Sequence, residues 1–175
     1  SEMDDVLKKL AETVKRIIER LKKLTDDSRR LVEEVHRRND KLSKESREAV
    51  RKAEERNIDE KDVRKLLEDL KKKSEEVAER NKRILDTLRE ISKRAEDEVR
   101  KVLKELEKTL KELEDRRPDR DHMVLHEYVN AAGITKALKR HKDENDKLLK
   151  EIEDSLRRHK EENDRLLEKL KESTR

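Results

Sequence analysis

The chain has 175 residues, of which 55% are charged, 30% hydrophobic and 1% aromatic, with one glycine, one proline and no cysteine. This composition excludes β-sandwiches, barrels and βαβ enzymes, which need turn residues and strand formers. The lack of cysteine also excludes disulfides and thiolate metal sites. The 50 basic and 46 acidic residues are interspersed, which argues against a nucleic-acid stripe or a basic membrane helix.

No apolar run approaches the length of a transmembrane helix, and the N-terminus does not have the pattern of a signal peptide. We therefore expect a soluble protein, cytoplasmic or recombinant, without a targeting signal. We expect neither nucleic acid nor a membrane among its partners.

Apolar residues spaced three and four apart predict a first helix over about 2–56 and a second over about 60–116. Two polar residues suit the break between them. Asn57 can adopt the left-handed conformation that follows a helix, and Asp59 is a plausible N-cap for the second helix.

Pro118 ends the second helix, because proline cannot continue the hydrogen-bond ladder. A third helix is predicted over about 119–173, with Asp119 and Asp121 suited to its positive N-terminal end. Connections of a few residues make neighbouring helices antiparallel. The predicted fold is all-α: an antiparallel, up-down-up three-helix bundle of long helices, forming a single domain over 1–175.

An internal repeat runs through the third helix. The segment from Leu138 to Ser155 is repeated from Leu156 to Ser173, a period of eighteen residues or about five turns at 3.6 residues per turn. The first helix keeps the same spacing between Leu24 and Leu42. This period leaves helices nearly straight, unlike a strict heptad. Such regularity resembles de novo designed helical bundles built on idealised backbones.

Polar residues interrupt the apolar stripes at two levels along the bundle. We predict two buried hydrogen-bond layers there, because an unsatisfied buried polar group costs about 1–3 kcal/mol. Their role would be to fix register, as a buried Asn does in coiled coils. The first level contains His36, Asn39, Ser43, Ser74, Asn81, Ser155, His159 and Asn163, and the second contains Thr25, Ser28, Ser92, His141 and Asn145.

A metal or catalytic site is the functional alternative for these histidines. Such a site needs imidazoles joined by carboxylates or a nucleophile, yet the predicted partners are Asn and Ser. We therefore expect no cofactor, no metal site and no enzymatic activity. A pH switch stays open as a further alternative, since buried histidines that become charged near pH 6 would break such layers.

Residues 120–135 differ in composition from the rest of the chain. They hold its only tyrosine, Tyr128, and its only glycine, Gly133, and few of them are charged. At a period of 3.6 the apolar residues form a usable core face, whereas at a period of two they alternate between two sides. The segment is therefore compatible with either a helix or a strand.

This segment resembles the last β-strand of green fluorescent protein, in the form used as the small tag of the split protein. His126, Tyr128 and Asn130 fit the tag form. The resemblance implies that the segment completes a barrel lacking this strand, which then matures its chromophore beside Glu127. The residues it implies for partner binding are Arg120, Asp121, His122, Met123, Val124, Leu125, His126, Glu127, Tyr128, Val129, Asn130, Ala131, Ala132, Gly133, Ile134 and Thr135.

Strand addition relies on main-chain hydrogen bonds to the open barrel. A helix has already paired these groups internally, so docking requires the start of the third helix to unfold. We therefore expect a designed scaffold or switch that stores the strand as helix, against core residues such as Leu10 and Leu106. It would donate the strand to the strand-deficient fluorescent protein fragment.

The alternative is a designed oligomerising module whose three helices bind a missing fourth helix or a second copy. The strand would then be a reporter tag. Adjacent apolar residues such as Leu66 and Leu67 broaden the stripes and favour this alternative.

Overall fold

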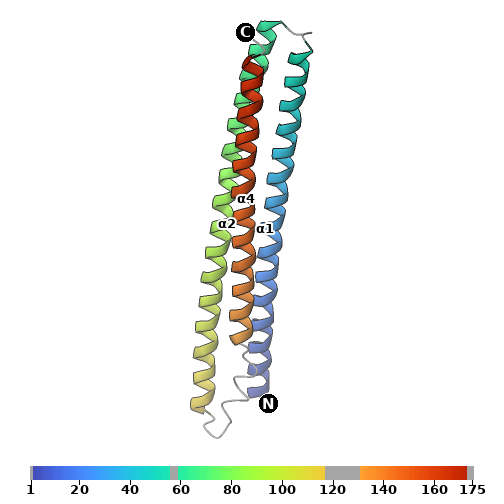
Figure 1. Cartoon of the computed structure of the whole chain (residues 1–175). Coiled ribbons are helices and arrows are strands. Elements are labelled where there is room, and N and C mark those ends of the chain that lie inside the picture. Colours follow the sequence, from blue (N-terminus) through green and yellow to red (C-terminus); the bar gives the residue numbers. More distant parts are fainter. Residues whose placement is uncertain (1, 56–58, 117–130, 173–175) are drawn as a thin grey trace. The chain divides into compact units, whose positions relative to one another are not determined.

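The computed structural model describes residues 2–55, 59–116 and 131–172. Side chains are described from residue 4 onward in the first range and from residue 133 onward in the last. These residues contain three α-helices and no strand (Figure 1): α1 (Glu2–Glu54, 53 residues), α2 (Glu60–Arg116, 57 residues) and α4 (Ala131–Glu172, 42 residues). The all-α prediction is confirmed. The features predicted at Asn57, Pro118, Asp119 and Asp121, and the predicted helix over 119–130, lie outside the described residues.

Local chemistry accounts for the helix ends on either side of the first connection. The amide of Val63 donates to the backbone carbonyl of Asp59 at 3.0 Å, as expected for a residue that precedes the helix. Glu60 and Asp62 lie in the first turn of α2, and Arg51 and Lys52 in the last turn of α1. Both arrangements oppose the partial charges of the helix ends and are therefore stabilising.

The chain divides into two compact units. Unit 1 comprises Ser1–Ser28 and Leu88–Lys147, and unit 2 comprises Arg29–Thr87 and Leu148–Arg175. Each unit contains one section of each helix. Each also holds its own apolar cluster and its own set of buried polar residues. A single domain over 1–175 stays a prediction.

Contacts between helices give the directions of the helices within unit 2. Partners on α1 and α4 increase together in residue number, so these two sections are parallel. Partners on α1 and α2 run in opposite order, so these are antiparallel. The pairs are His36–Glu151, Ser43–His159 and Arg47–Glu162 for α1 and α4, and Asn39–Asn81 and Glu45–Lys73 for α1 and α2.

Unit 1 has the same arrangement. Asn145 and Lys142 of α4 contact Ser92 and Glu96 of α2 in opposite order, so these sections are antiparallel. The offset between hydrogen-bonded partners on α1 and α4 is 116 residues at the Thr25–His141 contact, and it is again 116 in unit 2 between Ser43 and His159. Up-down-up order therefore describes the helices in each unit.

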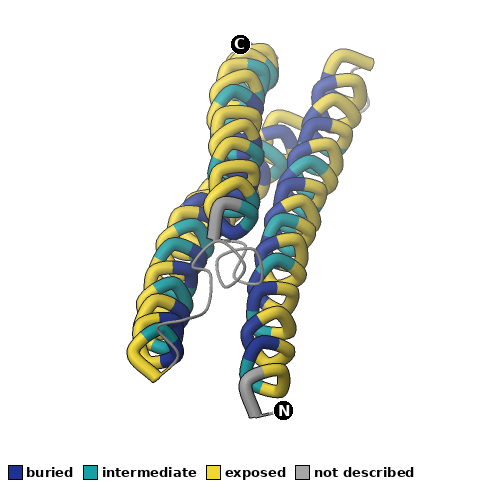
Figure 2. The backbone as a smooth tube through the Cα atoms, turned by 90° about the horizontal axis from the view of Figure 1, so that it is seen from below, coloured by how far each residue is buried: buried dark blue, intermediate teal, exposed yellow. Residues whose placement is uncertain are grey.

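The buried positions form a stripe along each helix (Figure 2). In unit 2 the cluster contains Ala49, Val50, Ala53, Val63, Leu70 and Leu170. Burial of one such leucine or isoleucine contributes about 1.5–3 kcal/mol, so these stripes supply most of the stability. The unit 1 cluster contains Leu7, Leu10, Val14, Ile17, Leu21, Leu24, Ala95, Val99, Leu106, Leu110, Leu113 and Ile134.

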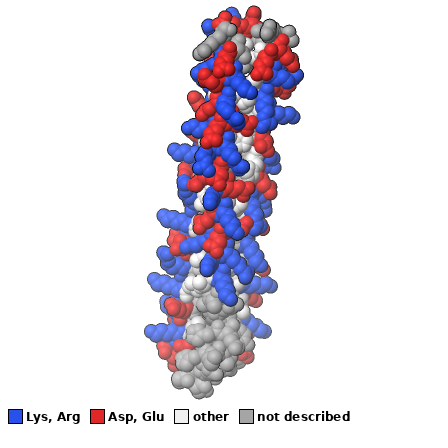
Figure 3. Space-filling model, viewed as in Figure 1, with Lys and Arg blue, Asp and Glu red and all other residues white. Residues whose placement is uncertain are grey.

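The surface carries lysine and arginine intermixed with aspartate and glutamate on the face shown in Figure 3. Many are paired one turn apart on the same helix, such as Arg83 with Glu79 at 3.0 Å. Exposed pairs of this kind contribute about 0.3–0.5 kcal/mol each, so they matter less than the core. Within the described ranges, no helix has a stretch apolar and long enough to span a bilayer.

Candidate functional site

The polar residues predicted for the second level lie in unit 1, and we call them the unit 1 layer: Thr25, Ser28, Ser92, His141 and Asn145. Two of its hydroxyls bond to their own helix. Thr25 Oγ1 donates to the carbonyl of Leu21 and Ser28 Oγ to that of Leu24, both at 3.1 Å. Such bonds to the residue four positions back satisfy a hydroxyl in a helix interior.

His141 is the titratable residue of this layer. It is only 2% exposed, and its Nδ1 lies 2.7 Å from Thr25 Oγ1. Because the Thr25 hydroxyl hydrogen is directed to Leu21, we assign the hydrogen of this contact to Nδ1. The other ring nitrogen, Nε2, is buried without a partner. Burial lowers the pKa of His141, and a hydrogen bond involving the backbone of Leu21 opposes this shift.

Asn145 joins α4 to α2 in the unit 1 layer. Its side chain is fully buried, and its Nδ2 donates to the carbonyl of Leu88 at 3.0 Å and to Ser92 Oγ. The amide oxygen Oδ1 is buried without a partner. The layer therefore links all three helices and leaves two acceptor atoms unsatisfied, one on His141 and one on Asn145.

In unit 2, Asn163 connects all three helices. Ser46 Oγ of α1 donates to its Oδ1 at 3.2 Å, and its Nδ2 donates to Ser74 Oγ of α2. The Ser74 hydroxyl donates in turn to the carbonyl of Leu70 at 2.7 Å. Within this series of hydrogen bonds, Ser46 Oγ, Asn163 Nδ2 and Ser74 Oγ each donate to an acceptor. The unit 2 layer, as we define it, contains Asn39, Ser43, Ser46, Ser74, Asn81, Ser155, His159 and Asn163.

Ser46 is a member of this layer that the sequence reasoning did not place there, although it is fully buried. The internal repeat carried the necessary signal. Ser46 follows Ser28 by eighteen residues, the period that relates His141 to His159 and Asn145 to Asn163.

Asn39 and Asn81 form a second contact in the unit 2 layer. Asn81 Nδ2 donates to Asn39 Oδ1 at 2.8 Å, and both side chains are at most 2% exposed. Asn39 Nδ2 and Asn81 Oδ1 are buried without partners. Exchanging oxygen and nitrogen in both amides leaves this balance unchanged, because either assignment gives one bond and two unsatisfied atoms.

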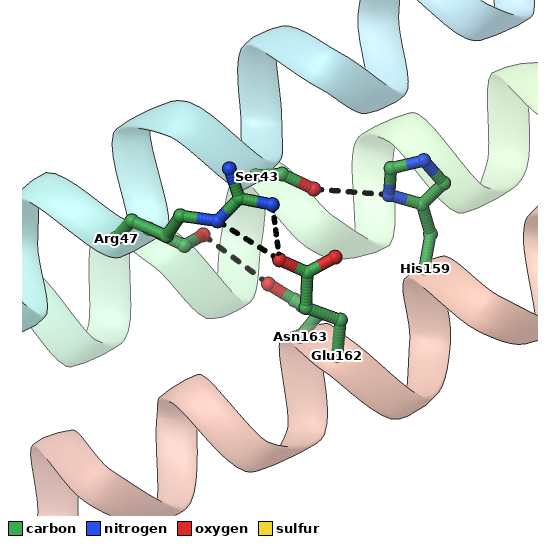
Figure 4. A network of polar contacts seen from close by, with 6 residues as sticks. Ser43, Arg47, His159, Glu162 and Asn163 are labelled. Atoms are coloured by element: carbon green, nitrogen blue, oxygen red, sulfur yellow. Dashed lines mark hydrogen bonds and ion pairs between the residues drawn. The ribbon is translucent and has the colours of Figure 1, made fainter.

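His159 occupies a more open environment than His141. Its Nδ1 lies 3.0 Å from Ser43 Oγ (Figure 4), and it is half-buried. Burial lowers the pKa of His159, the carboxylates of Glu162 and Asp40 oppose this, and His36 and Arg158 add to the lowering. Nearby carboxylates thus offset part of the cost of charging this ring.

These residues border a groove between α1 and α4 in unit 2, with a volume of about 720 Å³. Glu162 Oε1 accepts hydrogen bonds from Arg47 Nε at 3.0 Å and Nη2 at 2.6 Å (Figure 4). His36, predicted for the buried network, lies at the edge instead: its side chain is 36% exposed and its Nε2 is 3.0 Å from Glu151 Oε1. Ser155 is buried and lines the groove.

The layers bring together amides, hydroxyls and imidazoles that can exchange hydrogen bonds and bind protons. No group of three or more histidine, aspartate or glutamate side chains among the described residues is arranged to hold a metal ion. Ser43 and His159 do form a hydroxyl–imidazole pair. Both lie in helix interiors, where the backbone amides are bonded within the helix, so these amides are not available to bind an oxyanion.

Residues 120–130 of the strand-like segment lie outside the described residues. Ala131 and Ala132 belong to α4, as do Gly133, Ile134 and Thr135. Ile134 is fully buried in the unit 1 cluster. Hydrogen-bonded partners on α1 and α4 differ by 116 in residue number, as Thr25 and His141 do, so Ile134 lies at the level of Ile18 on α1. Ile18 packs against the same cluster. The described end of this segment is thus helical and anchored by one side chain.

No protein-family model matches the chain, and no curated protein matches it. Among solved structures, one match is a "Computationally designed three helix bundle" with 19% sequence identity and a TM-score of 0.43. The match covers 99% of this chain and 89% of that one. A likeness of this degree does not identify a function.

Proposed function

We propose that this chain is a designed, non-catalytic helical scaffold that stores a split fluorescent protein strand as helix and donates it to the strand-deficient barrel. Three features support the proposal. The segment Arg120–Thr135 resembles that strand, the eighteen-residue period is typical of idealised design, and Ile134 is helical and fully buried. The partner is the fluorescent protein fragment that lacks the strand.

The burial of Ile134 carries the storage part of this proposal. Residues 131–135 form the first turn of α4, where the backbone carbonyls accept hydrogen bonds from amides four positions further on. These carbonyls are among the groups that strand addition requires. The barrel can therefore take up the segment only after the first turns of α4 unwind and Ile134 leaves its cluster. Full burial of one isoleucine is worth about 1.5–3 kcal/mol.

This energy sets a lower bound on the effect of storage. The apparent affinity of a segment falls by the fraction of molecules in which it is accessible. Since about 1.4 kcal/mol corresponds to a factor of ten, withdrawing Ile134 alone slows or weakens complementation about ten- to a hundredfold relative to the free peptide.

Complementation kinetics test the proposal. The chain is mixed with the strand-deficient barrel and fluorescence is followed in parallel for the free peptide of residues 120–135. Leu106→Asp places a charge in the unit 1 cluster, where Leu106 is 2% exposed, and should move the rate toward that of the peptide. Leu70→Asp is the matched control, because it damages the buried cluster of unit 2 instead.

Three results distinguish the possibilities. A slow parent, a fast Leu106→Asp variant and a slow Leu70→Asp variant support storage in unit 1. Equal rates for the parent, both variants and the free peptide contradict storage and leave a simple display of the strand. Absence of fluorescence even from the free peptide contradicts the resemblance itself.

One observation favours a second candidate function, a module that binds a missing fourth helix or a second copy. A groove of about 290 Å³ in unit 2 has half-buried Leu42 and Val77 in its lining, with Arg38, Lys41, Lys73 and Arg80 among its charged residues. Sedimentation equilibrium over a wide concentration range tests self-association. A monomer at all concentrations contradicts the second-copy version of this function.

A further inference from the structure

The internal repeat places two histidines at equivalent positions, yet the structure surrounds them differently. His141 is 2% exposed, contacts the neutral Thr25 and has an unpartnered Nε2. His159 is half-buried and borders a groove that Asp40 and Glu162 also line. Adding a proton therefore has different consequences in the two units.

At neutral pH the unit 1 layer holds a neutral imidazole. Thr25 Oγ1 accepts from Nδ1, and Nε2 is an acceptor without a donor. Protonation turns Nε2 into a donor and places a full charge in the interior. The nearby unpartnered atom is Asn145 Oδ1, a neutral amide oxygen, and a neutral acceptor does not compensate for the cost of burying a charge.

The charged groups around this level do not offset that cost. Burial and the backbone of Leu21 are the causes that act on the pKa of His141, and no carboxylate is among them. Among the acidic residues near this level of α2, Glu96 pairs with Lys142 at 3.2 Å and Glu98 with Arg20 at 3.5 Å. The charged residues of unit 1 within about one turn of this level include Lys22, Lys23, Asp26 and Asp27 on α1, Lys93, Arg94, Glu96, Asp97, Glu98 and Arg100 on α2, and Lys139, Arg140, Lys142, Asp143 and Glu144 on α4.

We propose that the unit 1 layer is an acid-sensitive latch: protonation of His141 opens the helices of unit 1 while those of unit 2 stay packed. The proposal concerns the helical chain alone and does not depend on strand donation. In the opened form the imidazolium is solvated and Thr25 keeps its bond to Leu21. In unit 2, burial also lowers the pKa of His159, but the carboxylates of Glu162 and Asp40 oppose part of this lowering.

The direction of the pH dependence follows from linkage. The pKa of His141 is below its ordinary value of 6.5 when unit 1 is closed, so the open form binds more protons. The closed form is therefore fully favoured above about pH 6.5 and loses stability as the pH falls. The opening equilibrium constant of unit 1 rises by up to about tenfold per pH unit until His141 is protonated in the closed form as well.

Hydrogen exchange resolved by peptide tests the proposal on the full chain. Protection factors are measured from about pH 7 to about pH 5, a range in which histidine titrates, and are corrected for intrinsic exchange rates. The expected result is a loss of protection in the unit 1 sections of α1, α2 and α4 as the pH falls, by at most about tenfold per pH unit. The unit 2 sections should lose less protection, because Glu162 and Asp40 offset part of the cost of charging His159.

Two substitutions at equivalent repeat positions assign the effect. His141→Leu removes the titrating ring and leaves the Thr25 hydroxyl bonded to Leu21, so the loss of protection in unit 1 should vanish. His159→Leu should retain it. Constant protection in the parent, equal losses in both units, or an unchanged loss in His141→Leu would each overturn the proposal.

A second measurement covers the case in which His141→Leu does not fold. Titration of the imidazole nitrogen resonances of the parent chain by NMR gives the pKa of His141 directly. A value below 6.5, with broadening confined to unit 1 as the pH falls, supports the latch. A value at or above 6.5 refutes it, because the closed form would then bind the proton at least as well as the open form.

Discussion

Replacing both Asn39 and Asn81 by leucine should stabilise unit 2, whereas replacing either one alone should change its stability little. In the parent, one hydrogen bond of 2.8 Å joins them and two buried atoms have no partner. A single Asn→Leu substitution removes one unsatisfied atom and creates another on the remaining amide. The double variant removes both, at about 1–3 kcal/mol each, and loses one bond worth about 0.5–1.5 kcal/mol.

The double variant should therefore gain about 0.5–5.5 kcal/mol in the free energy of unfolding, and this gain should exceed the sum of the changes in the single variants. Guanidinium unfolding followed by circular dichroism at 222 nm measures this for all four members of the cycle. Sedimentation confirms that the oligomeric state is unchanged. Additive gains, half in each single variant, would refute the reasoning, because a single variant should still contain two unpartnered atoms, both on the remaining amide.

Two further substitutions test the polar layers and the core. Asn163→Ala breaks the contacts to Ser46 and Ser74, so it should lower the free energy of unfolding by about 1–3 kcal/mol in the same unfolding assay. Ser155→Ala is the control. A loss no larger than that of this control would contradict the role of Asn163 in linking the helices. Ile134→Ala should cost about 2–5 kcal/mol of protection in unit 1 by hydrogen exchange, while exposed Lys136→Ala should stay within about 0.5 kcal/mol.

Much of the candidate site followed from helical periodicity and the repeat. Asn145 and His141 continue the apolar stripe of α4, so their burial in the core was predictable once the helix was. The same reasoning overstated the burial of His36, which reaches the edge of unit 2 and bonds to Glu151. A residue beside an apolar stripe can turn outward when a charged partner is available at the surface. A single sequence does not show whether such a residue faces the core or the surface.

The unsatisfied atoms were beyond the reach of sequence reasoning. Asn39 and Asn81 were assigned to one level, but whether each amide is fully bonded depends on which atoms meet at angstrom distances. The structure leaves two of their four polar atoms without partners. It also shows Arg47 paired with Glu162 beside His159, although Arg47 is exposed and lies outside the apolar stripe.

The amino-acid pattern by itself determined that this chain forms long amphipathic helices, and at which levels polar residues interrupt the core. These properties depend on residues within a few turns of one another. Only the packing of three helices decided that His141 is enclosed without a charged partner, while His159, at the same position of the repeat, borders carboxylates. Burial and pairing depend on residues from other helices, such as Thr25 beside His141 and Asp40 near His159, which lie more than a hundred positions away in the sequence.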